Sequence, residues 1–227
     1  MVLDSAMMAN TNAAGDDMME KKRTCTQISL VRHGQVANPD EIIYGRLPGF
    51  RLSRKGFSQA QRVARRLSGT TLSALFSSPL LRARQTAGEI LRHHSHLTLQ
   101  IRPAINEVLT PFEGRPAWQV KDRLEDFYSG CPPEYEQPRD IVRRVSDFIE
   151  EVHQHYRGRH VVAVTHGDVI AFTVLWAKGQ SLDPAQKARL DRFGLADAYP
   201  ATASITTLRI ADHDAVAGLQ VDYHTSV

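Results

Sequence analysis

The chain has 227 residues, of which 42% are apolar and 23% charged, and its 28 Lys and Arg against 25 Asp and Glu leave a formal net charge of +3. This composition is typical of a soluble globular protein, and so small a positive excess is too weak to indicate nucleic-acid binding. The two cysteines lack CxxC spacing, which excludes a disulfide scaffold and a zinc–thiolate site. No apolar run approaches the roughly 20 residues of a membrane-spanning helix. We therefore expect a cytoplasmic protein without nucleic-acid or membrane partners.

Residues 1–24 are rich in Ala, Asn, Asp and Met and show no hydrophobic periodicity. We expect a disordered tail there, and no signal peptide, because the segment is polar and acidic. From residue 25 to residue 227 no second change of composition, repeat or linker interrupts the chain. The sequence therefore predicts a single domain over 25–227. It leaves open whether that domain is a monomer or a homo-oligomer.

Short apolar runs alternate along the chain with segments of helical periodicity. The run HVVAVT at 160–165 is apolar throughout, which favours a strand buried on both faces of a largely parallel sheet. We therefore expect an α/β three-layer sandwich, with helices on both faces of a mostly parallel central sheet and ligands at the carboxyl ends of its strands. In chain order, we expect strands over 26–31, 72–77, 97–101, 160–165, 203–210 and 219–223, and helices near Ser53 (N-cap), Ser78 (N-cap, with Pro79 as first helical residue), Pro138 and Asp168.

Two of the expected strands end in a histidine followed by glycine, in LVRHG (His33) and in VTHG (His166). A side chain just beyond a strand end projects into a cleft, and the glycine lets another group approach the backbone closely. A single such histidine is more often a loop residue or a satisfied core residue. Two of them, one beside Arg32, indicate a functional site.

The segment SSPLLRARQTA places Arg82 in the opening turn of its helix. A cation is unfavourable at that end of a helix, where free N–H groups and the dipole are positive. An anion bound beside Arg82 would reverse the penalty. The alternative is a solvated surface arginine, which is the better interpretation of Arg84.

The fragments LVRHG, SSPLLRARQTA, a Glu in the loop after the third strand, and VTHGD occur in this order. Together they resemble the histidine phosphatase superfamily, in its phosphoglycerate mutase-like branch, from about residue 26 to at least residue 172. The resemblance implies that His33 is a nucleophile that becomes phosphohistidine. It also implies that Arg32, Arg82 and His166 surround the phosphoryl group. No cofactor and no metal site is required by such a mechanism.

The resemblance further implies a general acid in the segment PAINEVLTPFEG, where Glu107 is the favoured candidate and Glu113 its local competitor. It implies substrate contacts from Asn38, Gly45 and Arg46, and from the glycine after the second histidine. That glycine is Gly167.

The family commonly follows RHG with Glu-Ser or Glu-Thr and then Trp-Asn, whereas here Gln35 follows, the tryptophan is missing and Asn38 comes one residue early. Arg46 and Arg51 are either contacts for a second anionic group or solvated loop charges.

The resemblance favours a metal-independent phosphomonoester hydrolase that acts on a small phosphorylated metabolite. One alternative is a mutase, which returns the phosphoryl group to a substrate, and another is a phosphate-binding relative without turnover. Nucleic-acid binding through Arg62, Arg65 and Arg66 is disfavoured because they lie on the polar side of an amphipathic helix without interleaved aromatic residues. No signature in 38–51 or 112–135 identifies the substrate.

Overall fold

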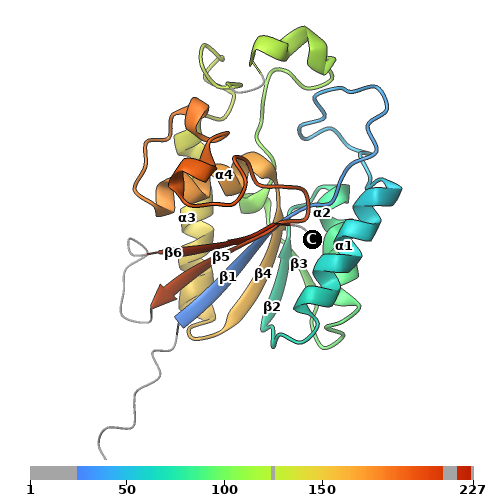
Figure 1. Ribbon diagram of the computed structural model, residues 1–227, viewed down its shortest axis with the longest axis vertical. Coiled ribbons are helices and arrows are strands. Elements are labelled where there is room, and N and C mark those ends of the chain that lie inside the picture. The colour runs from blue at the N-terminus through green and yellow to red at the C-terminus, as the bar shows by residue number, and fades with distance from the viewer. Residues whose placement is uncertain (1–24, 124–125, 212–218, 226–227) are drawn as a thin grey trace, which may run out of the picture.

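The computed structural model describes residues 25–123, 126–211 and 219–225, so the expected N-terminal tail lies outside the described residues. A six-stranded sheet runs through the middle of the molecule in the order β3-β2-β4-β1-β5-β6 (Figure 1). The four strands β3, β2, β4 and β1 are parallel, whereas β5 runs antiparallel to both β1 and β6. The strands are β1 (Cys25–Arg32), β2 (Ala74–Ser77), β3 (Leu99–Ile101), β4 (His160–Thr165), β5 (Ile205–Ala211) and β6 (Gln220–His224).

Helices cover both faces of this sheet. One side carries α1 (Arg54–Leu67) and α2 (Leu81–Leu91), and the other carries α3 (Pro138–His155) and α4 (Gly167–Ala177) (Figure 1). The predicted α/β three-layer sandwich is thus confirmed. Four short 3₁₀ segments lie in the connections: Pro103–Ile105, Ala117–Arg123, Pro184–Gln186 and Leu190–Phe193. Within the described parts of the chain, no helix is both long and apolar enough to cross a membrane.

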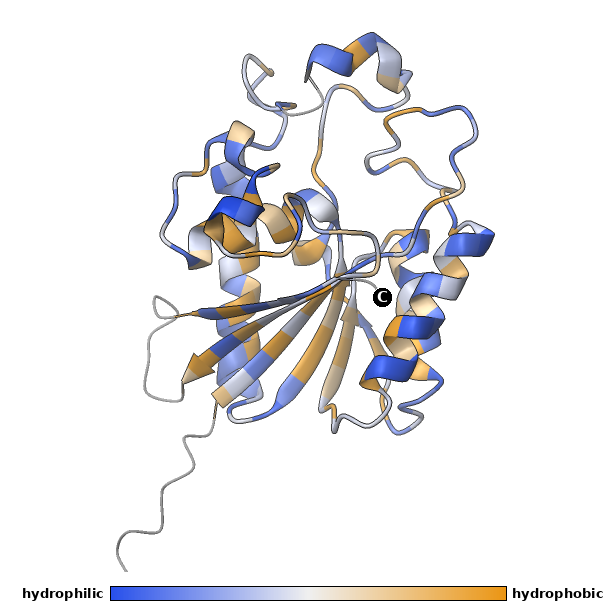
Figure 2. Cartoon of the chain, viewed as in Figure 1, coloured by the Kyte–Doolittle hydropathy of each residue, from blue (hydrophilic) through white to orange (hydrophobic). Residues whose placement is uncertain are grey.

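The apolar run of β4 fills two hydrophobic cores at once. Val161 and Ala163 pack in the core under α3 and α4, while Val162 and Val164 pack in the core under α1 and α2. All four side chains are fully buried, because successive residues of a strand point to opposite faces. Figure 2 shows the hydrophobic colours concentrated along the strands and hydrophilic ones on the outward side of α1. A continuous rather than alternating apolar pattern therefore identified a central strand.

The two expected serine caps have different outcomes. Ser53 is the N-cap of α1, as predicted, and its Oγ accepts a hydrogen bond from Gly56 N at 3.0 Å. The prediction for Ser78 is wrong, because α2 begins at Leu81 with Leu80 as its N-cap. The backbone N–H of Ser78 donates to Val164 O at 2.9 Å, which holds the residue to the sheet edge and delays the helix.

The same edge brings three segments together. His33 N, directly after β1, donates to Thr165 O at the end of β4. Ser78 N, directly after β2, donates to Val164 O, the carbonyl one residue earlier in β4. The loops that leave β1, β2 and β4 therefore start side by side at the carboxyl end of the parallel strands. This is where ligands bind in open α/β sheets.

Candidate active site

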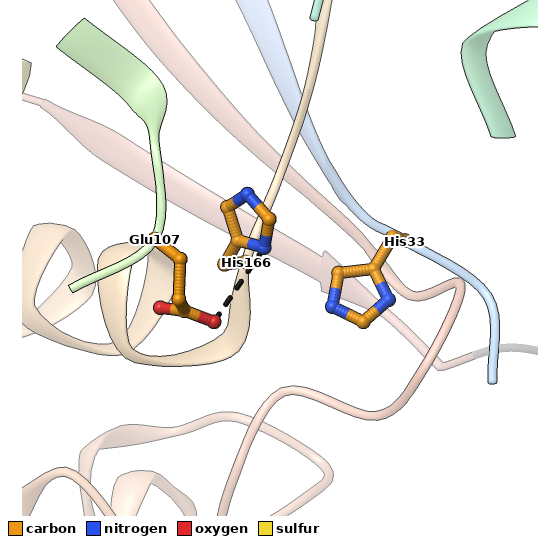
Figure 3. Close-up of side chains that lie close together, drawn as sticks. All are labelled: His33, Glu107 and His166. Atoms are coloured by element: carbon orange, nitrogen blue, oxygen red, sulfur yellow. Dashed lines mark ion pairs between the residues drawn. The ribbon is translucent and has the colours of Figure 1, made fainter. Parts of the chain in front are cut away.

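Four predicted residues meet at this edge of the sheet. His33 follows β1, Arg82 lies in the first turn of α2, Glu107 lies in the loop after β3, and His166 is the N-cap of α4. The two histidines and Arg82 are buried, while the Glu107 side chain remains 17% exposed. The rings of His33 and His166 lie 5.2 Å apart, and both face the Glu107 carboxylate (Figure 3).

The hydrogen bonds of His33 define its tautomer. Nδ1 lies 2.8 Å from Gly34 O, which can only accept, so Nδ1 carries the proton. Nε2 is left with a free electron pair and accepts a hydrogen bond from Arg82 Nε at 3.2 Å. Burial and the charges of Arg82 and Arg32 hold the pKa of His33 well below its usual value, so the ring stays neutral. Nε2 is therefore available as a nucleophile.

Ser78 holds His166 in the other tautomer, with the proton on Nε2 rather than on Nδ1 as in His33. Ser78 Oγ donates its proton to Asn106 Oδ1 at 3.1 Å and accepts from His166 Nε2 at 2.7 Å. The proton of the ring is thus on Nε2, and Nδ1 accepts from Arg82 Nη2 at 3.3 Å. Burial, followed by the charges of Arg82 and other neighbours, also holds the pKa of His166 well below its usual value. Both imidazoles are therefore neutral and oriented by Arg82.

Glu107 lies beside both Arg82 and His166. Its Oε1 accepts a hydrogen bond from Val108 N at 2.9 Å, and Oε2 lies 3.8 Å from Arg82 Nη2 and 3.5 Å from His166 Nδ1. Burial raises the pKa of Glu107 above its usual value, against the attraction of Arg82, and the charge of Asp168 adds to the increase. A carboxyl group with this bias can hold a proton and release it, which is what a general acid must do.

The competing carboxylate has a different position. Glu113 Oε1 accepts a hydrogen bond from Arg46 N at 2.5 Å, so it holds the loop around Gly45. That residue has a positive φ of 34°, and a Cβ there would lie only 2.3 Å from the Glu113 carboxylate. Gly45 O in turn accepts from Arg82 Nη2 at 2.7 Å. Glu113 thus fixes the loop whose Gly45 carbonyl binds Arg82, whereas Glu107 faces the histidines.

Arg32 lies at the opening of the site. Its Nη1 donates to Pro200 O at 2.6 Å, and its guanidinium lies over the Tyr199 ring, 5.0 Å from the ring centre. Its Nε is buried and has no hydrogen-bond partner among the described residues. This N–H is a donor to which an anion in the site could bind.

The donor set fits an anion better than a metal ion. Within the described ranges, one group of His, Cys, Asp and Glu side chains could hold a metal: His33, Glu107 and His166, whose ligand atoms lie within 4.8 Å of one another. The Arg82 guanidinium already contacts or approaches the same atoms, Nε2, Oε2 and Nδ1. A metal there would lie beside a fixed positive charge, which is unfavourable at such a short distance.

The structure places the other expected contacts as follows. Gly45 reaches the site through its carbonyl oxygen, whereas the Arg46 side chain is bound by Glu136 Oε2 at 2.7 Å and by Glu107 O at 2.6 Å. Asn38 exchanges two hydrogen bonds with the backbone of Ile42, which closes a turn. Gly167 starts α4, and a Cβ there would lie 2.2 Å from the Tyr199 hydroxyl. Asn38 and Arg46 thus shape loops around the site.

A family model described as the histidine phosphatase superfamily, branch 1, matches residues 28–216. The chain belongs to the histidine phosphatase superfamily. It is 34% identical to the uncharacterized protein Rv0525 of Mycobacterium tuberculosis over 171 residues, which cover 71% of this chain and 84% of that protein. It is 26% identical to the adenosylcobalamin/alpha-ribazole phosphatase of Escherichia coli over 202 residues, which cover 82% of this chain and 96% of that enzyme.

Solved structures share the fold of this histidine phosphatase. YhfR of Bacillus stearothermophilus superposes with a TM-score of 0.72 at 21% identity, over 89% of this chain and 98% of that one. The mycobacterial glucosyl-3-phosphoglycerate phosphatase Rv2419c superposes with a TM-score of 0.70 at 21% identity, over 88% of this chain and 98% of that one. The expected resemblance is confirmed, and the chain is a phosphatase or phosphoglycerate mutase-like member of its superfamily.

The histidine phosphatase site also contains a buried group that sequence reasoning missed. The Asp168 carboxylate accepts hydrogen bonds from the hydroxyls of Tyr128 and Tyr199 (2.6 Å for Tyr199) and forms an ion pair of 2.7 Å with Lys187. Although burial would raise it, these partners, Lys187 first, hold the pKa of Asp168 below its usual value. We call these four residues the Asp168 cluster. Asp168 directly follows VTHG in the sequence, but no pattern marks its three partners.

Proposed function

We propose that this chain hydrolyses small phosphomonoesters through a phosphohistidine intermediate, without a metal ion. The observation that carries the proposal is the unprotonated Nε2 of His33, buried and facing Arg82, with the Glu107 carboxyl group in the same cluster, beside Arg82 and His166. The unpartnered Nε of Arg32 supports it, because a phosphate oxygen would supply the missing acceptor.

In the first step, His33 Nε2 attacks phosphorus in line with the ester oxygen. The P–O bond to the leaving group breaks, and the electron pair goes to that oxygen, which takes a proton from Glu107. In the second step, the Glu107 carboxylate removes a proton from water, whose oxygen attacks the phosphorus of phosphohistidine. The P–N bond breaks, inorganic phosphate leaves, and both His33 and Glu107 return to their starting protonation states.

The arginines supply the electrostatic part of catalysis. The Arg82 guanidinium is fixed by Gly45 O and by both imidazoles, so little reorganisation is needed when charge develops on the phosphoryl oxygens. Arg32 is fixed by Pro200 O and the Tyr199 ring. His166, tied to Ser78, keeps Arg82 in place through Nδ1.

The names of relatives support hydrolysis. The Escherichia coli relative is a phosphatase, and so is the mycobacterial structural neighbour. A relative named 2,3-bisphosphoglycerate-dependent phosphoglycerate mutase, from Pseudoalteromonas atlantica, is 30% identical over 154 residues, or 64% of this chain. A mutase assay is therefore the control for the proposal.

The test is phosphate release from a panel of phosphomonoesters in the presence of EDTA, with the wild-type chain and His33→Ala. We expect release that resists EDTA and is lost in the variant, together with an acid-labile, base-stable phosphoryl label on the wild-type chain alone. Interconversion of 2- and 3-phosphoglycerate without phosphate release would show a mutase instead. Release that persists in His33→Ala would overturn the phosphohistidine mechanism.

A further inference from the structure

A cavity with a volume of about 210 Å³ opens beside the catalytic residues. It touches Arg32 and Glu107, so any group esterified to a phosphate in the site has to pass into it or along it. Its volume is below the roughly 300–1,000 Å³ of sites for drug-sized ligands, which favours a compact leaving group. Its apolar lining consists of Ile42, Ile43, Tyr44, Val108 and Phe127.

Two polar side chains of the wall, those of Asp168 and Thr110, already have partners within the chain. Both oxygens of Asp168 accept hydrogen bonds, one from Tyr199 and the other from Tyr128 and Lys187. Thr110 Oγ1 accepts from Phe112 N at 3.4 Å. The wall therefore presents mainly apolar surface to a leaving group.

The charges around the cavity disfavour an anionic leaving group. Among the described residues that line it, Arg32 is the one with a cationic side chain, whereas the Asp168 carboxylate is paired with Lys187 and Glu107 is the proton donor of the proposed reaction. Arg46 and Lys187 do not line the cavity; Arg46 shares Glu136 with Arg144, and Lys187 is paired with Asp168. A second anionic group on the substrate would lose its water in the cavity, where the one cationic side chain of the described lining, Arg32, is already used by the phosphate, and that loss is costly.

We propose that the natural leaving group is a compact, uncharged alcohol with an apolar body, which packs between Ile43 and Phe127, and that esters with a second anionic group on the leaving group are poor substrates. This inference rests on the proposed function, because the phosphate position defines which cavity receives the leaving group. It separates this chain from enzymes that act on bisphosphates or phosphorylated carboxylic acids, where the remote anion requires a cation.

The first measurement compares kcat/KM for a series of n-alkyl phosphates and for two aryl phosphates. From methyl to butyl phosphate, we expect a rise of about three- to fourfold per methylene until the cavity is full. We expect phenyl phosphate to be preferred over 4-carboxyphenyl phosphate by roughly tenfold or more, since a carboxylate that loses its water without gaining a cationic partner costs at least that much.

Variants of the wall should change this selectivity. In Phe127→Ala, we expect the gain from methyl to butyl phosphate to fall by about fivefold or more, because the ring no longer packs against the chain. Ile101→Ala is the matched control, since Ile101 is an exposed apolar residue of β3 that does not line the cavity. In Ile43→Lys, the new cation should raise the rate ratio of the carboxylated to the plain aryl ester by about tenfold.

The outcomes separate this inference from the proposed function. A flat alkyl series, or a carboxylated ester hydrolysed as fast as phenyl phosphate, overturns the inference while hydrolysis that depends on His33 still supports the proposed function. Absence of phosphate release from every ester, or release that survives His33→Ala, overturns the proposed function and the inference with it.

Discussion

The inner and outer halves of the site are built in different ways. The inner half, which we call the phosphate cradle, consists of Arg32, His33, Arg82 and His166, each within a few residues of the end of a buried strand. The outer half, the cavity wall, comes from loops and from the Asp168 cluster, which connect distant parts of the chain. The cradle offers charge and hydrogen bonds, whereas the wall offers apolar surface. Such a division lets a family retain one reaction while the wall changes the substrate.

The largest expected effect tests the centre of the cradle. His33→Ala removes Nε2, the atom that forms the P–N bond in the proposed mechanism, so we expect kcat/KM to fall by at least roughly 10⁴-fold. The measurement is steady-state hydrolysis of p-nitrophenyl phosphate. His155→Ala, on the exposed side of α3, is the matched control and should keep the wild-type rate. A fall of less than tenfold in His33→Ala would place the nucleophile elsewhere.

Glu107 lies between the cradle and the wall, and the effect of replacing it should depend on the leaving group. For Glu107→Gln, we expect a loss of about 10²–10⁴-fold with butyl phosphate, because an alkoxide needs a proton to leave. With p-nitrophenyl phosphate the loss in kcat/KM, which reports only the first step, should be much smaller, since nitrophenolate leaves without a proton. Glu113→Gln is the control, because its amide oxygen can still accept from Arg46 N. Equal losses with both esters would contradict the acid role.

The pH dependence follows from the same residues. His33 loses its nucleophilic electron pair only at low pH, because its pKa is held well below the usual value. Glu107 has a raised pKa and acts as an acid only when protonated, so alkyl ester hydrolysis should decline as pH rises through that pKa. We expect this decline with rising pH to disappear in Glu107→Gln. A wild-type decline unchanged in the variant would assign it to another group.

Arg82→Lys keeps the charge of the cradle and removes its fork of donors. One ammonium group cannot bind Gly45 O and both histidines in the same geometry, so we expect a loss of about 10²–10³-fold in kcat. Arg84→Lys, two residues along the same helix and exposed, is the matched control. Wild-type kinetics in Arg82→Lys would show that the several hydrogen bonds of the Arg82 guanidinium are not needed for the reaction.

The smallest expected effect on rate tests how the wall supports the cradle. Asp168→Asn leaves Lys187 buried without a counter-ion, and we expect the free energy of unfolding to fall by about 3–5 kcal/mol and kcat by about tenfold. The double variant Asp168→Asn, Lys187→Met should recover most of the stability, because no unpaired charge remains. Chemical denaturation measures the first effect and p-nitrophenyl phosphate hydrolysis the second. Stability unchanged in the single variant would show that the ion pair contributes nothing.

The cradle was predictable from the sequence because its residues follow recognisable signals. His33 and His166 come directly after apolar strands, and Arg82 lies in a helix opening where its charge needs compensation. Ser78 shows the limit: its position before Pro79 indicates an N-cap, but its hydroxyl instead fixes the tautomer of His166. That choice depends on a residue far along the chain, and no local pattern encodes it.

The wall was not predictable, because its contacts also depend on residues far along the chain. The side chain of Arg46, an expected substrate contact, pairs with Glu136, and Asp168 pairs with Lys187, in each case through three-dimensional proximity rather than helical or strand spacing. Pairs of this kind have no periodic signature in one sequence. The expected tail over 1–24 lies outside the described residues and stays a prediction.

The position of β1 in the sheet determines when the site of a newly made chain can be completed. Among the described strands, β1 is translated first, whereas its two neighbours in the sheet, β4 and β5, are translated much later. Arg32 reaches its final partners, Tyr199 and Pro200, only when the segment before β5 has also been made. A chain that terminates after α4 would contain His33, Arg82, Glu107 and His166, but it would lack β5 and the contacts of Arg32 with Tyr199 and Pro200.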